Sequence, residues 1–241
     1  MGLPRIVLFD LDDTLAESFR PPTPDMIERL ERMVALVPVA IITGGGFERI
    51  RRDFLSVMRS GTDFSRFFLF PNSSAQCYLY RDGSWEKEYD LLLGLEERNF
   101  IKKTILETIE EMPECRDLQY YGERIDDREA QIAFTAVGLD APREIKVGWD
   151  ADRSMRLRLC SLLAPKLPGF DVVVGGASSI DINRQTINKS YGVGWLSKRL
   201  NIPASEMLFI GDGLLPGGND APVISTGVET KVVMNPADTA Q

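Results

Sequence analysis

Short apolar runs that do not alternate with polar residues mark the predicted strands of this chain. Four such runs are rich in β-branched and aromatic side chains, and they cover residues 6–9, 39–42, 207–210 and 231–234. A run of this kind fits a strand that is covered on both faces, as in a parallel sheet. Residues 67–70 form a fifth candidate.

Helical spacing separates the predicted strands. Residues 24–36 carry apolar side chains at helical intervals, with Thr23 as a predicted N-cap and a proline at the first position. Further helices are predicted over residues 47–58 and 188–200. This alternation of strand and helix at both ends of the chain predicts an α/β domain with a doubly wound, Rossmann-like parallel sheet.

The middle of the chain has a different pattern. Two short strands, 76–80 and 85–89, flank an Asp-Gly pair that predicts a hairpin. Beyond them we expect a mixture of helices and strands: helices over 95–112 and 150–167, and strands over 131–137, 171–174 and 179–182. This mixture predicts an inserted α+β domain. The expected division gives residues 1–75 and 184–241 to the α/β domain and 76–183 to the insertion.

Composition excludes several classes of function. The 241 residues carry a net charge of −8, so the chain offers no global basic field for a nucleic acid. There is no histidine, which removes Ser-His-Asp and Cys-His nucleophiles and imidazole-bound zinc. Three scattered cysteines suggest no disulfide framework. No signal peptide and no apolar run of about 18 residues is present. A cytoplasmic protein with no membrane or nucleic-acid partner is therefore expected.

Three of the predicted strands run into polar residues: the first into Asp10, the second into Thr43, and the strand over 207–210 into Gly-Asp212. Ligands of open α/β sheets bind beyond the carboxyl ends of the strands, so these groups should converge. With Asp12 close by, the carboxylates there cannot all stay ionised without a cation. Mg²⁺, which takes carboxylate and phosphate oxygens, is the predicted metal. The structural alternative is an Asx turn over residues 10–13.

Two further signals suit a phosphate. Thr43 precedes Gly44, Gly45 and a third glycine at the start of a predicted helix, where backbone N–H groups and the helix dipole favour an anion. Lys189 begins the helix that leads back to the strand before Asp212 and can bring a positive charge to the same edge. Taken alone, a glycine turn commonly has no ligand and such a lysine is commonly solvated. It is the combination of these signals with the strand-end groups that predicts a phosphate site.

These motifs together resemble those of the haloacid dehalogenase superfamily. They are D-L-D-D-T at residues 10–14, T-G-G at 43–45, Lys189, and G-D-G-L-L-P-G-G-N-D at 211–220. The resemblance implies phosphoryl transfer through an aspartyl-phosphate on Asp10, with Asp12 as the acid and then the base. It also implies that Thr43, Gly44, Gly45 and Lys189 hold the phosphoryl group. Mg²⁺ would be bound by Asp10, the carbonyl of Asp12 and Asp212.

A second resemblance covers more of the chain. F-P-N-S-S-A at 70–75 and G-G-A-S-S-I-D-I at 175–182 are similar to the eukaryotic-type phosphomannomutases and their bacterial relatives, and the insertion resembles the C2B-type cap of that group. In this family cap arginines hold the distal phosphate of a sugar phosphate. The substrate-binding residues implied here are Arg20, Arg128, Lys146, Ser179 and Asp181.

The chain departs from that family at one cap position. Leu139 follows a glycine where the family has an arginine, although Arg143 and Lys146 lie nearby. Losing a guanidinium contact weakens the case for a mutase, which must hold either phosphate of a hexose bisphosphate. We therefore predict a Mg²⁺-dependent phosphohydrolase of a phosphorylated sugar or similar small metabolite. A phosphohexomutase is the alternative, and a non-catalytic phosphometabolite-binding protein is the alternative of another class.

Interpretations without a binding role also stay open for the cap residues. Arg128 follows two aspartates and could form a surface ion pair. Ser179 and Asp181 alternate with isoleucines, so their side of the strand could face water. The expected assembly is a monomer or a homodimer through the cap.

Overall fold

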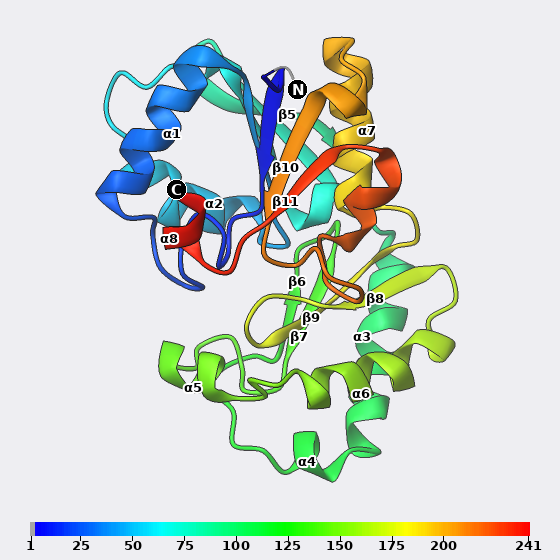
Figure 1. Cartoon of the computed structure of the whole chain (residues 1–241). Helices are drawn as coiled ribbons and strands as arrows, with labels where there is room; N and C mark the ends of the chain where they lie inside the picture. The colour runs from blue at the N-terminus through cyan, green and yellow to red at the C-terminus, as the bar shows by residue number, and fades with distance from the viewer. Residues whose placement is uncertain (1–2) are drawn as a thin grey trace. The chain divides into compact units, whose positions relative to one another are not determined.

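The computed structural model describes residues 3–241, which form two units (Figure 1). The first unit runs to Asp90 and resumes over Ile187–Gln241, and the second is Leu91–Thr186. The second unit is thus an insertion into the first.

A seven-stranded sheet forms the centre of the first unit, in the order β11-β10-β1-β2-β3-β4-β5. Its parallel strands are β1 (Ile6–Phe9), β2 (Val39–Ile42), β3 (Phe67–Phe70), β10 (Met207–Gly211) and β11 (Glu229–Val232). The strands β1, β2 and β3 are buried throughout, as their unbroken apolar sequences predict.

Helices cover both faces of this sheet. The helix α1 (Pro24–Leu36) has the predicted bounds, and its N-cap Thr23 accepts a hydrogen bond from the Met26 N–H at 3.3 Å. Its buried side chains pack on the sheet face that carries Val7 and Phe9, whereas α7 (Lys189–Leu200) packs on the face that carries Ile6 and Leu8. The α/β fold with a doubly wound parallel core is therefore confirmed.

Two short helices complete the first unit. The helix α2 (Phe47–Asp53) ends earlier than the predicted residue 58, and a 3₁₀ turn over Leu55–Val57 follows it. The helix α8 (Pro236–Thr239) lies at the end of the chain.

The boundary after the first unit lies later than expected. The hairpin of β4 (Gln76–Arg81) and β5 (Ser84–Asp90) extends the seven-stranded sheet, because β4 pairs antiparallel with β3. The expected boundary at residues 75 and 76 therefore cuts through elements that share one sheet. The turn itself is as predicted, with Asp82 and Gly83 at φ values of 48° and 85°.

The second unit has its own antiparallel sheet in the order β6-β7-β9-β8. Its strands are β6 (Ile125–Asp127), β7 (Ile132–Thr135), β8 (Phe170–Val174) and β9 (Ser179–Arg184), and its helices are α3 (Leu95–Glu110), α4 (Pro113–Arg116), α5 (Arg143–Gly148) and α6 (Ser154–Leu163). Apolar residues of α3 and α6 pack against β7 and β9 in a separate core.

Local chemistry explains where this second unit departs from the predicted elements. The helix α6 begins at Ser154 and not at residue 150, because the Asp150 carboxylate accepts hydrogen bonds from the N–H groups of Met155 and Arg156 at 2.7 and 3.0 Å. Asp150 itself has a φ of 52°, outside helical geometry. The strand β6 was not predicted because its three residues include two aspartates.

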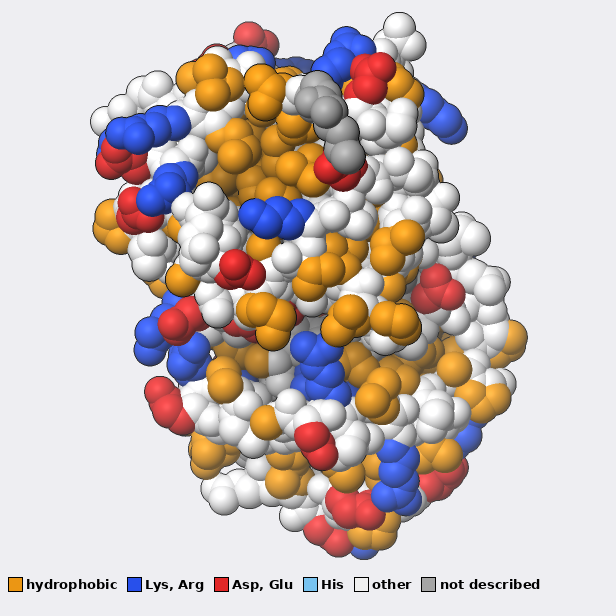
Figure 2. All heavy atoms as spheres, viewed as in Figure 1, with side chains coloured by type: hydrophobic (Ala, Val, Ile, Leu, Met, Phe, Trp, Pro, Cys, Tyr) orange, Lys and Arg blue, Asp and Glu red, His pale blue; other side chains and the backbone are white. Residues whose placement is uncertain are grey.

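Acidic and basic side chains are interspersed on the face drawn in Figure 2. The helix α1 carries two exposed ion pairs, Arg29–Asp25 at 2.8 Å and Arg32–Glu28 at 2.7 Å. Within residues 3–241, none of the helices is both long enough and apolar enough to span a bilayer.

Candidate active site

One edge of the parallel sheet gathers the predicted catalytic groups. The strands β10, β1 and β2 are neighbours and run in parallel, so Asp212, Asp10 and Thr43 leave the sheet at the same end. The Asp10 N–H donates to the Ile210 carbonyl at 3.0 Å, which continues the pairing of β1 with β10 up to the site. The structure therefore brings the three strand ends together as the sequence predicts.

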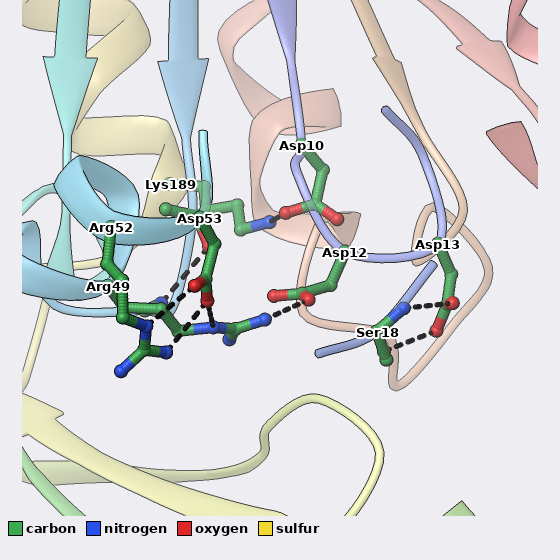
Figure 3. Close-up of polar contacts among 10 residues, drawn as sticks. Asp10, Asp12, Asp13, Ser18, Arg49, Arg52, Asp53 and Lys189 are labelled. Atoms are coloured by element: carbon green, nitrogen blue, oxygen red, sulfur yellow. Dashed lines mark hydrogen bonds and ion pairs between the residues drawn. The ribbon is translucent and has the colours of Figure 1, made fainter. Parts of the chain in front are cut away.

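Lys189 reaches this edge from the first turn of α7. Its side chain is completely buried, and Nζ lies 2.5 Å from Asp10 Oδ1 and 2.5 Å from Asp220 Oδ1 (Figure 3 shows the pair with Asp10). The helix is anchored there by Asn188, whose side chain accepts the Ser190 N–H at 3.0 Å. The lysine is thus a buried counter-ion of two carboxylates and is not a solvated surface residue.

The electrostatics of this cluster are dominated by burial. Burial raises the pKa of the Asp10 carboxyl well above its ordinary range; Lys189 opposes this shift, and the neighbouring carboxylates add to it. Burial alone would lower the pKa of Lys189, but Asp10 and Asp220 outweigh it and raise that pKa above its usual value. The carboxyl groups around Asp10 can therefore carry more negative charge than Lys189 balances.

Three carboxylates of the cluster can hold a metal ion. Oxygen atoms of Asp10, Asp212 and Asp220 all lie within 4.8 Å of one another. Their all-oxygen chemistry and their excess of negative charge over Lys189 fit a hard divalent cation such as Mg²⁺. Thr14 helps to fix the loop, because its hydroxyl accepts the Asp212 N–H at 3.1 Å.

Asp220 is an acidic residue of this cluster that was not predicted from the sequence. It is fully buried, and besides Lys189 it accepts the Gly213 N–H at 2.9 Å. The sequence did contain an indication of this role, because Asp220 is the last residue of the G-D-G-L-L-P-G-G-N-D motif. A carboxylate eight residues after Asp212, beyond a glycine-rich loop, can return to the same sheet edge.

The Asp12 carboxylate is outside this cluster. It pairs with the guanidinium of Arg49, which comes from α2 (Figure 3). The next residue, Asp13, turns away and accepts the N–H and the hydroxyl of Ser18 at 3.0 and 2.8 Å. Asp13 therefore has a local partner, although Ser18 is five residues away and not two as in an Asx turn, whereas Asp10 has long-range partners.

The glycine turn after β2 has Thr43 at its start. The Thr43 hydroxyl accepts the Gly45 N–H at 3.1 Å, which leaves the hydroxyl proton available to donate. The turn is fixed from outside by the Asn72 and Ser73 N–H groups, which donate to the carbonyls of Gly45 and Thr43 at 3.0 and 2.8 Å. Phosphoryl binding by Thr43, Gly44 and Gly45 remains a prediction.

Arg20 does not join the carboxylate cluster. Its side chain is largely exposed and pairs with Glu17 at 3.0 Å, three residues earlier. The substrate-binding role expected for Arg20 stays a prediction.

Two candidate residues of the second unit, Arg128 and Lys146, each have a local partner. Arg128 pairs with Asp126 at 2.7 Å and donates to the Gln131 side chain at 2.7 Å, which is the local pairing that the sequence left open. Lys146 Nζ donates to the Leu139 carbonyl at 2.6 Å.

Ser179 and Asp181 alternate on β9 as predicted, but Asp181 is only 4% exposed and does not belong to a solvated strand face. A Cβ added at Gly175 would lie 2.3 Å from Ser179 Oγ and 2.8 Å from Asp181 Oδ2. The absence of a side chain at Gly175 therefore lets the loop before β9 close over these two groups.

Comparison with known proteins supports the same chemistry. Residues 145–239 match the family model of haloacid dehalogenase-like hydrolases. Among curated proteins, phosphomannomutase of Spinacia oleracea is 25% identical over 97% of this chain and 92% of its own length. Phosphomannomutase 2 of Dictyostelium discoideum is 24% identical over 97% of this chain and 93% of its own length.

Solved structures share the fold at low sequence identity. An IMP-nucleotidase of Plasmodium falciparum with a truncated N-terminus and bound IMP superposes with a TM-score of 0.73 and 17% identity, over 99% of this chain and 66% of that chain. This chain thus spans just under two thirds of the nucleotidase. A haloacid dehalogenase-like hydrolase from Bacteroides thetaiotaomicron superposes with a TM-score of 0.59 and 16% identity, over 93% of this chain and 86% of that chain. This chain is therefore similar to haloacid dehalogenase-like hydrolases over residues 145–239 and to phosphomannomutases over almost its whole length.

Proposed function

We propose that this chain is a Mg²⁺-dependent phosphohydrolase that transfers the phosphoryl group of a phosphorylated sugar, or of a similar small metabolite, to Asp10 and then to water. The observation that carries this proposal is the buried cluster in which Lys189 lies 2.5 Å from both Asp10 and Asp220. A carboxylate can attack an anionic phosphate only if nearby cations balance the two negative charges, and Lys189 provides such a cation beside Asp10.

The reaction would have two steps. In the first, an Asp10 carboxylate oxygen attacks phosphorus, the bond from phosphorus to the sugar oxygen breaks, and Asp12 gives its proton to the departing oxygen. In the second, Asp12 takes a proton from water as the water oxygen attacks phosphorus, and the bond from phosphorus to Asp10 breaks. The cycle returns both carboxyl groups to their starting forms.

Each remaining group at the sheet edge has a part in this scheme. Mg²⁺ held by Asp10 and Asp212, with the Asp12 carbonyl or Asp220 as a further ligand, would neutralise phosphoryl charge. Lys189 and the Thr43 hydroxyl would hold phosphoryl oxygens, together with the N–H groups of the turn at Gly44 and Gly45. The missing histidines cause no difficulty, because carboxylates perform the proton transfers.

Substrate recognition is proposed for the second unit. Arg128, Lys146, Ser179 and Asp181 would bind the sugar and any distal phosphate, and Arg20 of the first unit would add a basic group. Closure of a cap over a phosphoryl-transfer site excludes bulk water. A cytoplasmic location and a monomer or cap-mediated homodimer complete this proposal.

A mutase is the second candidate function. It is favoured by the curated phosphomannomutases, which align with almost the whole chain. Hydrolysis is favoured by Leu139, which stands at the position of a cap arginine in that family and offers Lys146 only its backbone carbonyl. A mutase has to bind its bisphosphate intermediate in two orientations, so each cap cation matters more to it than to a hydrolase.

One assay separates these functions. Phosphate release is measured with Mg²⁺ against a panel of hexose 1- and 6-phosphates, with and without a trace of glucose 1,6-bisphosphate, while isomer interconversion is followed. We expect free phosphate without interconversion. Interconversion that depends on the bisphosphate would establish the mutase. Binding of a sugar phosphate without either reaction would establish the non-catalytic alternative.

A further inference from the structure

Two carboxylates two residues apart are each held by a different cation. Asp10 is held by Lys189 of α7, whereas Asp12 is held by Arg49 of α2 (Figure 3). Arg49 Nη2 donates to Asp12 Oδ1, and it is the one hydrogen-bond donor to this carboxylate among residues 3–241. The structure thus separates the predicted nucleophile from the predicted acid and base by giving each its own partner.

Arg49 is itself firmly positioned. Its guanidinium carbon lies 5.2 Å from the centroid of the Phe19 ring, and Nε lies 3.7 Å from Asp53 Oδ2, so an aromatic face and a second carboxylate flank it. The side chain keeps only 26% of its surface exposed.

This environment keeps Arg49 charged. Burial alone would lower its pKa, but Asp12, followed by Asp53, outweighs that effect and raises the pKa above the ordinary value. Arg51 and Arg52 of the same helix differ, because both are mostly exposed and pair with Glu48 and Asp53. Of the three arginines of α2, Arg49 is the one directed to a predicted catalytic group.

The contact also distinguishes the two oxygens of Asp12. Arg49 takes Oδ1, and no hydrogen bond within the described residues reaches Oδ2. A planar guanidinium that fixes one carboxyl oxygen restricts rotation of the group, so the second oxygen acquires a defined direction. Proton transfer needs such a fixed direction, since misplacement by about 1 Å can cost about 100-fold in rate.

We propose that Arg49 is the positioning residue of the acid and base Asp12, holding Oδ1 so that Oδ2 gives the proton to the leaving oxygen and later takes one from water. This inference rests on the proposed function and assigns it a residue that the motifs do not contain. No bond to Arg49 forms or breaks in either step, and the proton moves only between Asp12 Oδ2 and the substrate or water.

Leaving groups of different basicity provide the test. Phenyl phosphate releases a phenol with a pKa near that of Tyr, about 10, and needs a proton for departure, whereas p-nitrophenyl phosphate releases a far more acidic phenol that does not. The two esters differ little in shape. For both, kcat/KM reports the step in which Asp10 is phosphorylated.

In Arg49→Met, we expect kcat/KM to fall about 100-fold for phenyl phosphate and less than about 5-fold for p-nitrophenyl phosphate, because a positioned acid contributes about 10²–10⁴-fold. Arg49→Lys should recover part of the loss for phenyl phosphate. The matched control Arg51→Met, which removes the same charge from an exposed place on α2, should leave both values within about 2-fold. Thermal unfolding of each variant shows whether the fold is kept.

A double-mutant cycle makes the result specific. In an Asp12→Asn background the change Arg49→Met should leave the ratio between the two esters unaltered, since the group it positions is gone. Equal losses for both esters in the single variant, or no loss, would overturn the inference and would make Arg49 a phosphate ligand or a purely structural residue. A wild-type protein that hydrolyses neither ester would instead overturn the proposed function, and this inference with it.

Discussion

The candidate cations of the two units, Lys189 in the first and Arg128 and Lys146 in the second, have different kinds of partner. In the first unit, Lys189 is buried and its partners Asp10 and Asp220 lie 179 and 31 residues away in the sequence. In the second unit, Arg128 pairs with Asp126 two residues away, and Lys146 donates to the carbonyl of Leu139 seven residues away. A long-range pair in the core forms only when the tertiary fold brings its two residues together, whereas a local pair can form between sequence neighbours in many different folds.

This difference fits the separate roles of catalysis and recognition that we propose for these residues. A buried charge is stable only when its partners are fixed, so the sheet edge must keep its constellation intact. Side chains with local, partly exposed partners can exchange them for a substrate at small cost, because such ion pairs contribute only about 0–1 kcal/mol. Under the proposed function, we therefore expect the cluster around Lys189 to act as a fixed catalytic centre and Arg128 to act as a more adaptable recognition group.

The largest effect should come from removing the buried cation. Lys189→Met leaves two buried carboxylates without their counter-ion, so we expect stability to fall by about 3–5 kcal/mol. Loss of a group that holds phosphoryl charge should lower kcat by about 10²–10³-fold. Urea unfolding and phosphate release at saturating Mg²⁺ measure the two effects.

Lys198→Met is the matched control for that variant. Lys198 is on the same helix but is exposed, so its replacement should change stability by less than about 0.5 kcal/mol. Comparable losses in the two variants would contradict the distinction between buried and exposed cations in the first unit.

A smaller and more selective effect is expected in the second unit. Arg128→Ala should raise KM for a hexose phosphate about 10- to 100-fold, because a hydrogen bond to a charged group contributes about 1.5–3 kcal/mol. For p-nitrophenyl phosphate, which has no distal polar group, KM should stay almost unchanged. Steady-state kinetics on the two substrates give the comparison.

Arg116→Ala serves as its control, because Arg116 is an exposed arginine of the same unit whose partner is the adjacent Asp117. It should leave KM for both substrates unchanged. A rise in KM of the same size for both substrates in Arg128→Ala would show that recognition is not the role of Arg128.

The two units differ in how far their structure can be predicted from the sequence. Unbroken apolar runs located β1, β2 and β10, and the parallel order then brought Asp10, Thr43 and Asp212 to one edge. The predicted end of the first unit is too early, because the hairpin pattern does not show that β4 also pairs with β3.

The sequence also did not predict which charged side chains pair with one another. The link from Arg49 to Asp12 spans 37 residues and depends on the direction in which α2 leaves the glycine turn. Asp220 could have been found from its motif, but its contact with Lys189 depends on how the loop over residues 211–220 folds back. Motifs identified the residue types, and the fold determined which of them meet.

The central claim is that phosphoryl transfer passes through Asp10. The Asp12→Asn protein is mixed with p-nitrophenyl [³²P]phosphate and Mg²⁺. The substrate should release p-nitrophenol, because this leaving group needs no acid, and the covalent phosphorylated protein should then accumulate, because the base that activates water is missing. After an acid quench, the account predicts a hydroxylamine-sensitive label on the peptide that contains Asp10, and no label when Asp10→Asn is added. Release of p-nitrophenol with no label on the protein, or a label on another residue, would contradict it.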